Sequence, residues 1–324
     1  MDLKDRWTIL KIAGLVLMVL LVSYSTYNYI QVEQRTIQVG YLPSNHHSAL
    51  FVADELGMYY KAGLTMELVP FRSGAEMIHA MQLGQIDVGY CGIAPVTTAI
   101  SKGVPIKVVA PVNTQGSGLV IPVNSTLNLS SDLSNKTVAI PRKGSVQDVL
   151  LNVLLLQNNI SASQLKITEL EAPLMPPSLK NGKIDAYVAW EPYVSSANFT
   201  GDGKIFLHSE EWWPNHPCCV VVARDDFIKK EPDQLSHFLK VHVKATDYIL
   251  NNPDESNLIV SQKLGTSNII ETEALKHVNF ISRPDDNFTA DVERFMEVQK
   301  KLGELKEIPD YKTLYDFQFL GNLS

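Results

Sequence analysis

Gly182-Lys183-Ile184-Asp185-Ala186-Tyr187-Val188-Ala189-Trp190-Glu191-Pro192-Tyr193 decides the fold, because an earlier stretch, Gly84-Gln85-Ile86-Asp87-Val88-Gly89-Tyr90-Cys91-Gly92-Ile93-Ala94-Pro95, repeats its pattern. Each stretch follows a short helical segment, at residues 77–83 and 177–181. A helix that stops at glycine and leads into a buried strand is one supersecondary unit. Two copies predict two α/β lobes built on one plan. The alternative is a chance resemblance between two buried strands.

Strands alternate with helices on both sides of the first copy. Strands are expected at residues 36–41, 64–70, 86–90 and 106–112, with helices at 48–60, from Ser73-Gly74 onward, and at 94–101. Such alternation implies a mainly parallel sheet that is covered on both faces. Ligands bind beyond the carboxyl ends of the strands in such sheets. Cys91-Gly92 and Trp190-Glu191 are therefore expected at the lips of the two lobes.

The second lobe follows a break at Gly116-Ser117-Gly118. The pattern predicts a crossing segment, two further strands around a helix, a return strand to the first lobe, and a mainly helical remainder from Asp233 that packs around it. These elements are expected at 119–123, 137–141, 146–157, 165–170 and 218–223. The predicted domains are a membrane anchor or signal segment at 1–35, lobe 1 at 36–118 plus 218–324, and lobe 2 at 119–217.

Composition narrows the possible functions. The chain has 324 residues, enough for two cores, and a hydrophobic content of 45% that is ordinary for a globular protein. The net charge of −7 argues against nucleic acid as a partner. The three cysteines, Cys91, Cys218 and Cys219, form neither a disulfide framework nor a CxxC metal motif.

The N-terminus has the pattern of a membrane signal. Lys4, Arg6 and Lys11 precede an apolar run at 12–22, and the chain then continues without charge to Ile30. An uncleaved anchor over residues 7–30 is favoured, with the N-terminus inside and the remainder outside the cytoplasm. Cleavage near Ser23-Tyr24-Ser25, giving a secreted or periplasmic protein, is the alternative. No cysteine follows the run, which excludes lipoprotein processing.

Glycosylation motifs agree with an extracytoplasmic location. Seven Asn-x-Ser/Thr sequons modestly favour an exported chain, and whether they are modified is left open. The sequons begin at Asn124, Asn128, Asn135, Asn159, Asn198, Asn287 and Asn322.

These motifs resemble the nitrate/sulfonate/taurine-binding family of receptors for ABC importers, which also includes receptors for the pyrimidine precursor of thiamine. The resemblance runs from about Val39 to the late 200s. Besides the two opening stretches it covers Leu56-Gly57-x-Tyr59, Ala62-Gly63-Leu64 and Gly103-x-Pro105-Ile106. It implies a two-lobed, periplasmic-binding-protein-like fold of type 2 with the ligand cleft between the lobes. The His46-His47 and Cys218-Cys219 pairs depart from the family pattern and leave the ligand open.

Several residues could bind a ligand in such a cleft. Gly144 and Ser145, beside Lys143, start a helix whose free N–H groups suit an anion, although Ser145 could be an ordinary helix cap. Trp190 offers a flat surface, and Glu191 could accept from an amine or serve only as a carboxylate at a helix start. The predicted ligand-binding residues are Asn45, His46, Ser73, Cys91, Gly92, Asn113, Gly118, Gly144, Ser145, Met175, Trp190, Glu191 and His216.

Other residues are given structural roles. Asp87 and Asp185 both precede buried strands and are expected to be structural. Only one of the adjacent pair His46-His47 is expected to reach the ligand, because side chains alternate along extended chain. A metal site of His46, His216 and Cys218 is an alternative, but small buried strand residues explain Cys218-Cys219 better. No metal and no cofactor are predicted.

The resemblance implies a substrate-binding protein of an ABC importer rather than an enzyme. It would capture a small anionic solute, as a monomer, and deliver it to membrane permease subunits. No Gly-x-Ser-x-Gly turn, His-Glu-x-x-His motif or phosphate loop occurs. The alternatives are a receptor for a thiamine-pyrimidine precursor, a pyrimidine-synthase-like enzyme on the same fold, and a sensor or adhesin that has lost transport.

Overall fold

The computed structural model describes residues 11–23, 35–127 and 130–320. The chain divides into two units, Met1–Thr36 and Ile37–Ser324, and each is described by itself. In the first, residues 11–23 form a helix with exposed side chains. Across the described part of the chain, no helix combines the length and apolar character needed to cross a membrane. The predicted anchor also covers residues 7–10 and 24–30, which lie outside the described residues.

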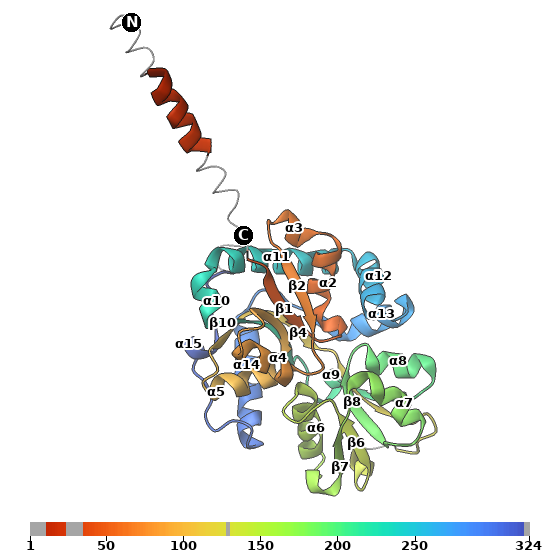
Figure 1. The fold of residues 1–324 in the computed structure, drawn as a ribbon. Helices are drawn as coiled ribbons and strands as arrows, with labels where there is room; N and C mark the ends of the chain where they lie inside the picture. The colour runs from red at the N-terminus through yellow and green to blue at the C-terminus, as the bar shows by residue number, and fades with distance from the viewer. Residues whose placement is uncertain (1–10, 24–34, 128–129, 321–324) are drawn as a thin grey trace, which may run out of the picture. The chain divides into compact units, whose positions relative to one another are not determined.

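The second unit contains two mixed β-sheets (Figure 1). The six-stranded sheet has the order β11-β4-β10-β3-β1-β2 and the five-stranded sheet the order β7-β6-β8-β5-β9. The six-stranded sheet consists of β1 (Ile37–Tyr41), β2 (Met66–Pro70), β3 (Val88–Gly92), β4 (Ile106–Gln115), β10 (Pro217–Arg224) and β11 (Val278–Phe280). The five-stranded sheet consists of β5 (Ser117–Ile121), β6 (Thr137–Ile140), β7 (Lys166–Glu169), β8 (Ala186–Trp190) and β9 (Lys204–His208).

The two sheets share one plan, which confirms the prediction drawn from the repeated stretches. In each, the first strand lies between the next two and is parallel to both: β1 between β2 and β3, and β6 between β7 and β8. The domain boundaries at 118/119 and 217/218 stay a prediction.

The prediction of mainly parallel sheets is corrected, because β5 and β10 run antiparallel to their neighbours. Both strands cross from one sheet to the other: β5 continues from β4 through Gly116, and β10 follows the end of the five-stranded sheet. A chain that crosses where carboxyl ends of parallel strands face each other enters the new sheet from that end. It must therefore run against the strands it joins.

Asp87 and Asp185 have matching structural roles, as expected. Asp87 Oδ2 accepts the Gln38 N–H at 3.0 Å, and Asp185 Oδ2 accepts the Thr137 N–H at 2.7 Å. Their own N–H groups donate to the Gln38 and Thr137 carbonyls at 2.9 and 2.8 Å. Each aspartate thus satisfies the backbone near the start of β1 or β6, the middle strand of the three parallel strands in its sheet.

Helices cover the sheets. The helix predicted at 48–60 is two helices, because Gly57 adopts a left-handed conformation with φ 62° between them. The helices are α2 (Ser48–Glu55), α3 (Met58–Lys61), α4 (Gly74–Gln82), α5 (Ile93–Ser101), α6 (Val146–Gln157), α7 (Met175–Lys180), α8 (Tyr193–Thr200), α9 (Ser209–Trp212), α10 (Asp225–Lys230), α11 (Pro232–Asn251), α12 (Pro253–Leu264), α13 (Asn268–Ala274), α14 (Asp286–Lys301) and α15 (Tyr311–Leu314). Short 3-10 helices are η1 (Asn45–His47), η2 (Ser130–Leu133), η3 (Ala162–Gln164), η4 (Ala172–Leu174) and η5 (Leu275–His277).

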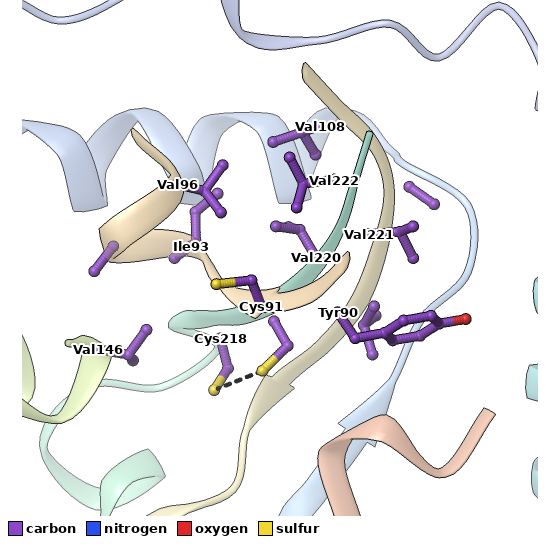
Figure 2. Close-up of a cluster of buried hydrophobic side chains, with 14 of the residues drawn as sticks. Tyr90, Cys91, Ile93, Val96, Val108, Val146, Cys218, Val220, Val221 and Val222 are labelled. Atoms are coloured by element: carbon purple, nitrogen blue, oxygen red, sulfur yellow. Dashed lines mark hydrogen bonds between the residues drawn. The ribbon is translucent and has the colours of Figure 1, made fainter. Parts of the chain in front are cut away.

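The main core surrounds β10. Val220, Val221 and Val222 are fully buried, as a central strand covered on both faces requires. Figure 2 shows this strand leading to Cys218, with Cys91 of β3 nearby and Val146 at the start of α6 on the other side. Side chains of the two sheets therefore meet where β10 begins, and this point is the floor of a pocket.

Candidate ligand-binding site

A pocket lies at the strand ends, lined by residues from both sheets and the helices that follow them. It encloses about 570 Å³, including the open space at its mouth. Its lining residues are Leu42, Ser44, His46, His47, Ser73, Gly74, Ala75, Gly92, Pro95, Pro141, Arg142, Lys143, Gly144, Ser145, Val146, Gln147, Trp190, Cys218 and Cys219.

The structure brings part of the predicted site together. The predicted residues that line the pocket are His46, Ser73, Gly92, Gly144, Ser145 and Trp190. Those that do not line it are Asn45, Cys91, Asn113, Gly118, Met175, Glu191 and His216. Some of the lining residues that sequence reasoning missed lie in first helical turns, namely Gly74, Ala75, Pro95, Val146 and Gln147. Others lie in the loops that follow β1 and β6, namely Leu42, Ser44, Pro141 and Arg142.

Three helices begin at the pocket wall. Ser73 caps α4, Gly92 precedes α5 and Ser145 caps α6. The first N–H groups of a helix have no partner within it and carry its partial positive charge. Among the described residues, the backbone N–H groups of Gly74, Ala75, Val146 and Gln147 make no hydrogen bond. The pocket therefore presents backbone donors from both sheets to an anionic group.

The Gly144-Ser145 turn is partly occupied by its own helix. Gly144 N–H donates to Asp148 Oδ2 at 2.8 Å, and Ser145 Oγ accepts from Asp148 N–H at 3.2 Å. Burial raises the pKa of Asp148, against the opposing effect of the Gly144 hydrogen bond. The N–H groups of Val146 and Gln147 are thus better placed to bind a ligand than those of Gly144 and Ser145, which the sequence suggested.

Trp190 supplies an unused donor. Its side chain is only 8% exposed and packs with Leu42 and Ala172. The indole Nε1 is buried and has no hydrogen-bond partner among the described residues. A buried indole N–H normally has a partner, so this one suits a ligand acceptor.

Glu191 lies at a helix start, as the second of its two predicted roles requires. It is fully buried, and its carboxylate accepts from Ser195 N–H at 2.9 Å and from Ser195 Oγ at 2.8 Å. Burial raises the pKa of Glu191 to about 7, although the Ser195 hydrogen bonds oppose the shift. The side chain therefore fixes the first turn of α8 and is not part of the pocket wall.

His46 and His47 both line the pocket, and the expectation that only one of them reaches the ligand stays a prediction. That expectation assumed extended chain, whereas the two residues lie in the 3-10 helix η1. His47 Nδ1 accepts from Leu42 N–H at 3.2 Å. Burial, and then the neighbouring His46, lower the pKa of His47 to about 3, so this imidazole is neutral.

His46 and Cys218 form a buried pair at the pocket floor. His46 Nε2 donates to the Gly116 carbonyl at 2.8 Å, which leaves Nδ1 facing Cys218 Sγ at 3.3 Å. Burial would lower the pKa of His46, but Cys218 outweighs it and the pKa is raised. The pKa of Cys218 is lowered by the Cys219 thiol and, against burial, by His46. The proximity of the two side chains thus shifts their pKa values in opposite directions.

Within the described ranges of the chain, two groups of side chains could hold a metal ion. In each, potential ligand atoms lie within 4.8 Å of one another: His46, Cys218 and Cys219 at the pocket floor, and His208, Glu210 and His277 elsewhere. His216, which the alternative metal site included, instead contacts Ser209 Oγ through Nε2 at 2.9 Å.

The remaining predicted residues hold the framework near the pocket. Asn45 Nδ2 donates to Glu271 Oε2 at 3.0 Å, and Asn113 Nδ2 donates weakly to the Thr114 carbonyl at 3.3 Å. Gly118 lies in β5 between β8 and β9. Cys91 and Met175 are fully buried core residues. Proximity to a strand end thus led to the region of the pocket, but not to the side chains that face it.

Comparison with known proteins identifies relatives of this architecture. The chain is 28% identical over 226 residues to the taurine-binding periplasmic protein of Escherichia coli K12, covering 69% of each chain. It is 26% identical over 215 residues to a putative aliphatic sulfonates-binding protein of Bacillus subtilis 168, covering 64% of each. These matches therefore span about two thirds of the relatives' own length.

A solved structure gives the same architecture. The zinc-bound ligand-binding component of an ABC-type import system from Staphylococcus aureus superposes with a TM-score of 0.81 at 22% identity, covering 90% of this chain and 99% of that one. This likeness shows that the chain has the α/β fold of periplasmic binding proteins. The sequence model of the NMT1-like family matches residues 31–262, and the chain belongs to that family.

Proposed function

We propose that the protein is the extracytoplasmic substrate-binding protein of an ABC importer, and that it captures a small organic sulfonate. The observation that carries this proposal is the convergence of three helix starts on one pocket. Uncompensated N–H groups and helix dipoles of this kind bind anions. The names of the relatives, which refer to taurine and aliphatic sulfonates, support the same ligand class.

The rest of the lining fits a ligand with an acidic head and a short apolar part. Lys143 and Arg142 add positive charge, and the Trp190 indole N–H offers a hydrogen bond to a sulfonate oxygen. Leu42 and Pro95 supply apolar surface for a carbon chain. A tetrahedral anion with three oxygens can use donors from several directions at once, which suits donors contributed by both sheets.

We infer that the two sheets, each with its helices, act as lobes that close on the ligand. Two hydrogen bonds join them beside the pocket: Ser44 Oγ donates to the Glu191 carbonyl at 3.1 Å, and Tyr193 OH to the Pro43 carbonyl at 3.2 Å. A ligand that touches both lobes binds the closed arrangement better than the open one, and this difference drives closure. The closed protein, as a monomer, would then deliver the bound ligand to the permease.

The experiment is titration calorimetry with taurine, ethanesulfonate, nitrate and a neutral aminopyrimidine. Sulfonates should bind, and Trp190→Phe should weaken them by about tenfold or more, since a hydrogen bond to a charged group contributes about 1.5–3 kcal/mol. Trp213→Phe is the matched control, because Trp213 is outside the pocket lining. Binding of the aminopyrimidine alone would replace the sulfonate proposal with a thiamine-precursor receptor. Equal affinity in both tryptophan variants would remove Trp190 from the site.

We further infer that residues 7–30 keep the protein at the outer side of the membrane. The support is the apolar run at 12–22, preceded by Lys4, Arg6 and Lys11. The periplasmic location in the name of the taurine-binding relative agrees with an extracytoplasmic domain. Alkaline carbonate extraction of membranes separates an uncleaved anchor from a removed signal peptide.

A further inference from the structure

A second group of polar side chains lies outside the pocket, where the two sheets meet. His208 is the last residue of β9 in the five-stranded sheet, and Glu210 follows it in α9. His277 ends η5, directly before β11 of the six-stranded sheet. The group therefore joins residues from both sheets, and the proposed ligand site uses none of them.

The three side chains are in close contact. His277 Nδ1 lies 2.7 Å from Glu210 Oε1. The imidazoles of His208 and His277 are stacked, with ring centroids 3.5 Å apart and planes at 9°. Burial, and then His277, lower the pKa of His208, whereas the Glu210 hydrogen bond raises the pKa of His277.

One atom of the group lacks a partner. Glu210 Oε2 is buried and makes no hydrogen bond within the part of the chain that the structure describes, whereas the His208 side chain faces the Glu211 N–H in a capping box. Unsatisfied buried polar atoms are uncommon in native structures, and an ion is one of their explanations. The carboxylate oxygen can only accept, so a cation or a donor is needed to satisfy it.

We propose that His208, Glu210 and His277 bind a divalent transition-metal ion of the zinc class and so bridge the two sheets. Two imidazole nitrogens and one carboxylate oxygen are a known donor set for zinc, with water as a fourth ligand. Their ligand atoms already lie within 4.8 Å of one another. The stacked rings must tilt for both nitrogens to face one ion, and the side chains of His277 and Glu210, 21% and 26% exposed, lie near enough to solvent to move.

The position of the group gives the ion a mechanical role. His208 is paired with Gly118 of β5, and Val278, next to His277, is paired with Gln115 of β4. The ligands thus stand on both sides of Gly116, where the chain crosses between the sheets. An ion held from both sides restricts bending at this crossing, and it stabilises the arrangement whose geometry it fits.

The test is calorimetric titration of metal-free protein with Zn²⁺ alone, without sulfonate. His208→Gln and His277→Gln should each raise the zinc dissociation constant at least tenfold, since even residues that only orient metal ligands change affinity by about 10–100-fold. His237→Gln, at an exposed histidine of α11, is the matched control and should leave the constant unchanged. Zinc should also raise the melting temperature of the wild type but not of His277→Gln.

The second cluster, at the pocket floor, needs its own control, because its thiols also attract zinc. The titration is therefore repeated with Cys218→Ser/Cys219→Ser, which should keep the bridging site. If that variant does not fold, Co²⁺ replaces Zn²⁺ in the wild type, and a thiolate-to-cobalt charge-transfer band identifies binding at the cysteines.

Equal zinc affinity in wild type, His208→Gln and His277→Gln, or no zinc binding at all, would overturn the proposal. So would complete loss of zinc binding in the cysteine variant. Sulfonate titration of His208→Gln separates this site from the ligand pocket: normal sulfonate affinity with lost zinc binding supports two independent sites, whereas absent sulfonate binding in every protein refutes only the proposed function.

Discussion

Gly92→Ala tests whether the two sheets close on the ligand. Gly92 has φ −62° and ψ 142°, which alanine adopts without strain, so the backbone tolerates the change. A Cβ at this position would lie 3.1 Å from Val146 Cγ2, and the next atoms, in Cys218 and Pro95, are 3.9 Å away. The only tight contact is thus with α6, the helix that follows β6 of the other sheet.

The size of the effect follows from this single contact. Overpacking by a few atoms costs about 1–3 kcal/mol, and one methyl against one flexible valine belongs near the lower limit. The added methyl group therefore destabilises the closed arrangement of the two sheets by about 1 kcal/mol and leaves an open arrangement unaffected. Because ligand binding requires the closed arrangement, the sulfonate dissociation constant should rise about fivefold. The free protein can avoid the cost by opening, and its melting temperature should change little.

The assay is calorimetry on a double-mutant cycle. Val146→Ala removes the methyl groups that the new side chain at position 92 would contact. The double variant Gly92→Ala/Val146→Ala should therefore bind sulfonate more tightly than the two single effects together predict. The expected coupling energy is about 1 kcal/mol. Gly40→Ala is the contrasting control, because its Cβ would lie 2.6 Å from Met77 Sδ in α4, within the layers of one sheet. That variant should lower the melting temperature.

Two results would refute the reasoning. If Gly92→Ala lowers the melting temperature as Gly40→Ala does but leaves sulfonate affinity unchanged, the contact is ordinary core packing. If affinity falls but Val146→Ala gives no coupling, the methyl group acts directly on the ligand instead of on closure.

Two further outcomes are expected. Because the folded pKa of Glu191 is about 7 against an ordinary 4.5, the native state binds more protons between these pH values, and the free energy of unfolding should fall by about 3 kcal/mol as pH rises through that window. Chemical denaturation from pH 4.5 to 8 should show this slope in wild type and in the exposed control Glu297→Gln, and a slope that persists in Glu191→Gln would contradict the assignment. Alkaline carbonate extraction should leave the full-length chain in the membrane pellet, whereas a soluble form that starts near residue 26 would demonstrate cleavage.

Local patterns were enough to predict the plan of the fold. Gly84-x-Ile86-Asp87 and Gly182-x-Ile184-Asp185 each combine a helix stop, a strand start and a carboxylate that binds the neighbouring strand. All of these features act within a few residues. The strand ends at Gly92 and Trp190, which such patterns locate in the sequence, both line the pocket.

Features that depend on distant pairing could not be predicted in the same way. The antiparallel place of β10 between β3 and β4 follows from the crossing of the chain, which no local pattern encodes. Glu191 directly follows Trp190 in sequence. Its carboxylate nevertheless accepts a hydrogen bond from the Ser195 N–H, four positions later, and so stabilises a helix start instead of facing the pocket. The role of Cys218 depends on a contact with His46, 172 positions away in sequence.

The place of β10 also determines the order in which the chain can complete its sheets. All strands of the five-stranded sheet lie between Ser117 and His208, so this sheet can form as soon as that segment is synthesised. The six-stranded sheet begins earlier but has a gap between β3 and β4 until Pro217–Arg224 arrives. Until then two apolar strands present unpaired edges, which are a template for wrong pairing. The half that starts first is therefore finished last, and a newly made chain is most prone to aggregation just before β10 is added.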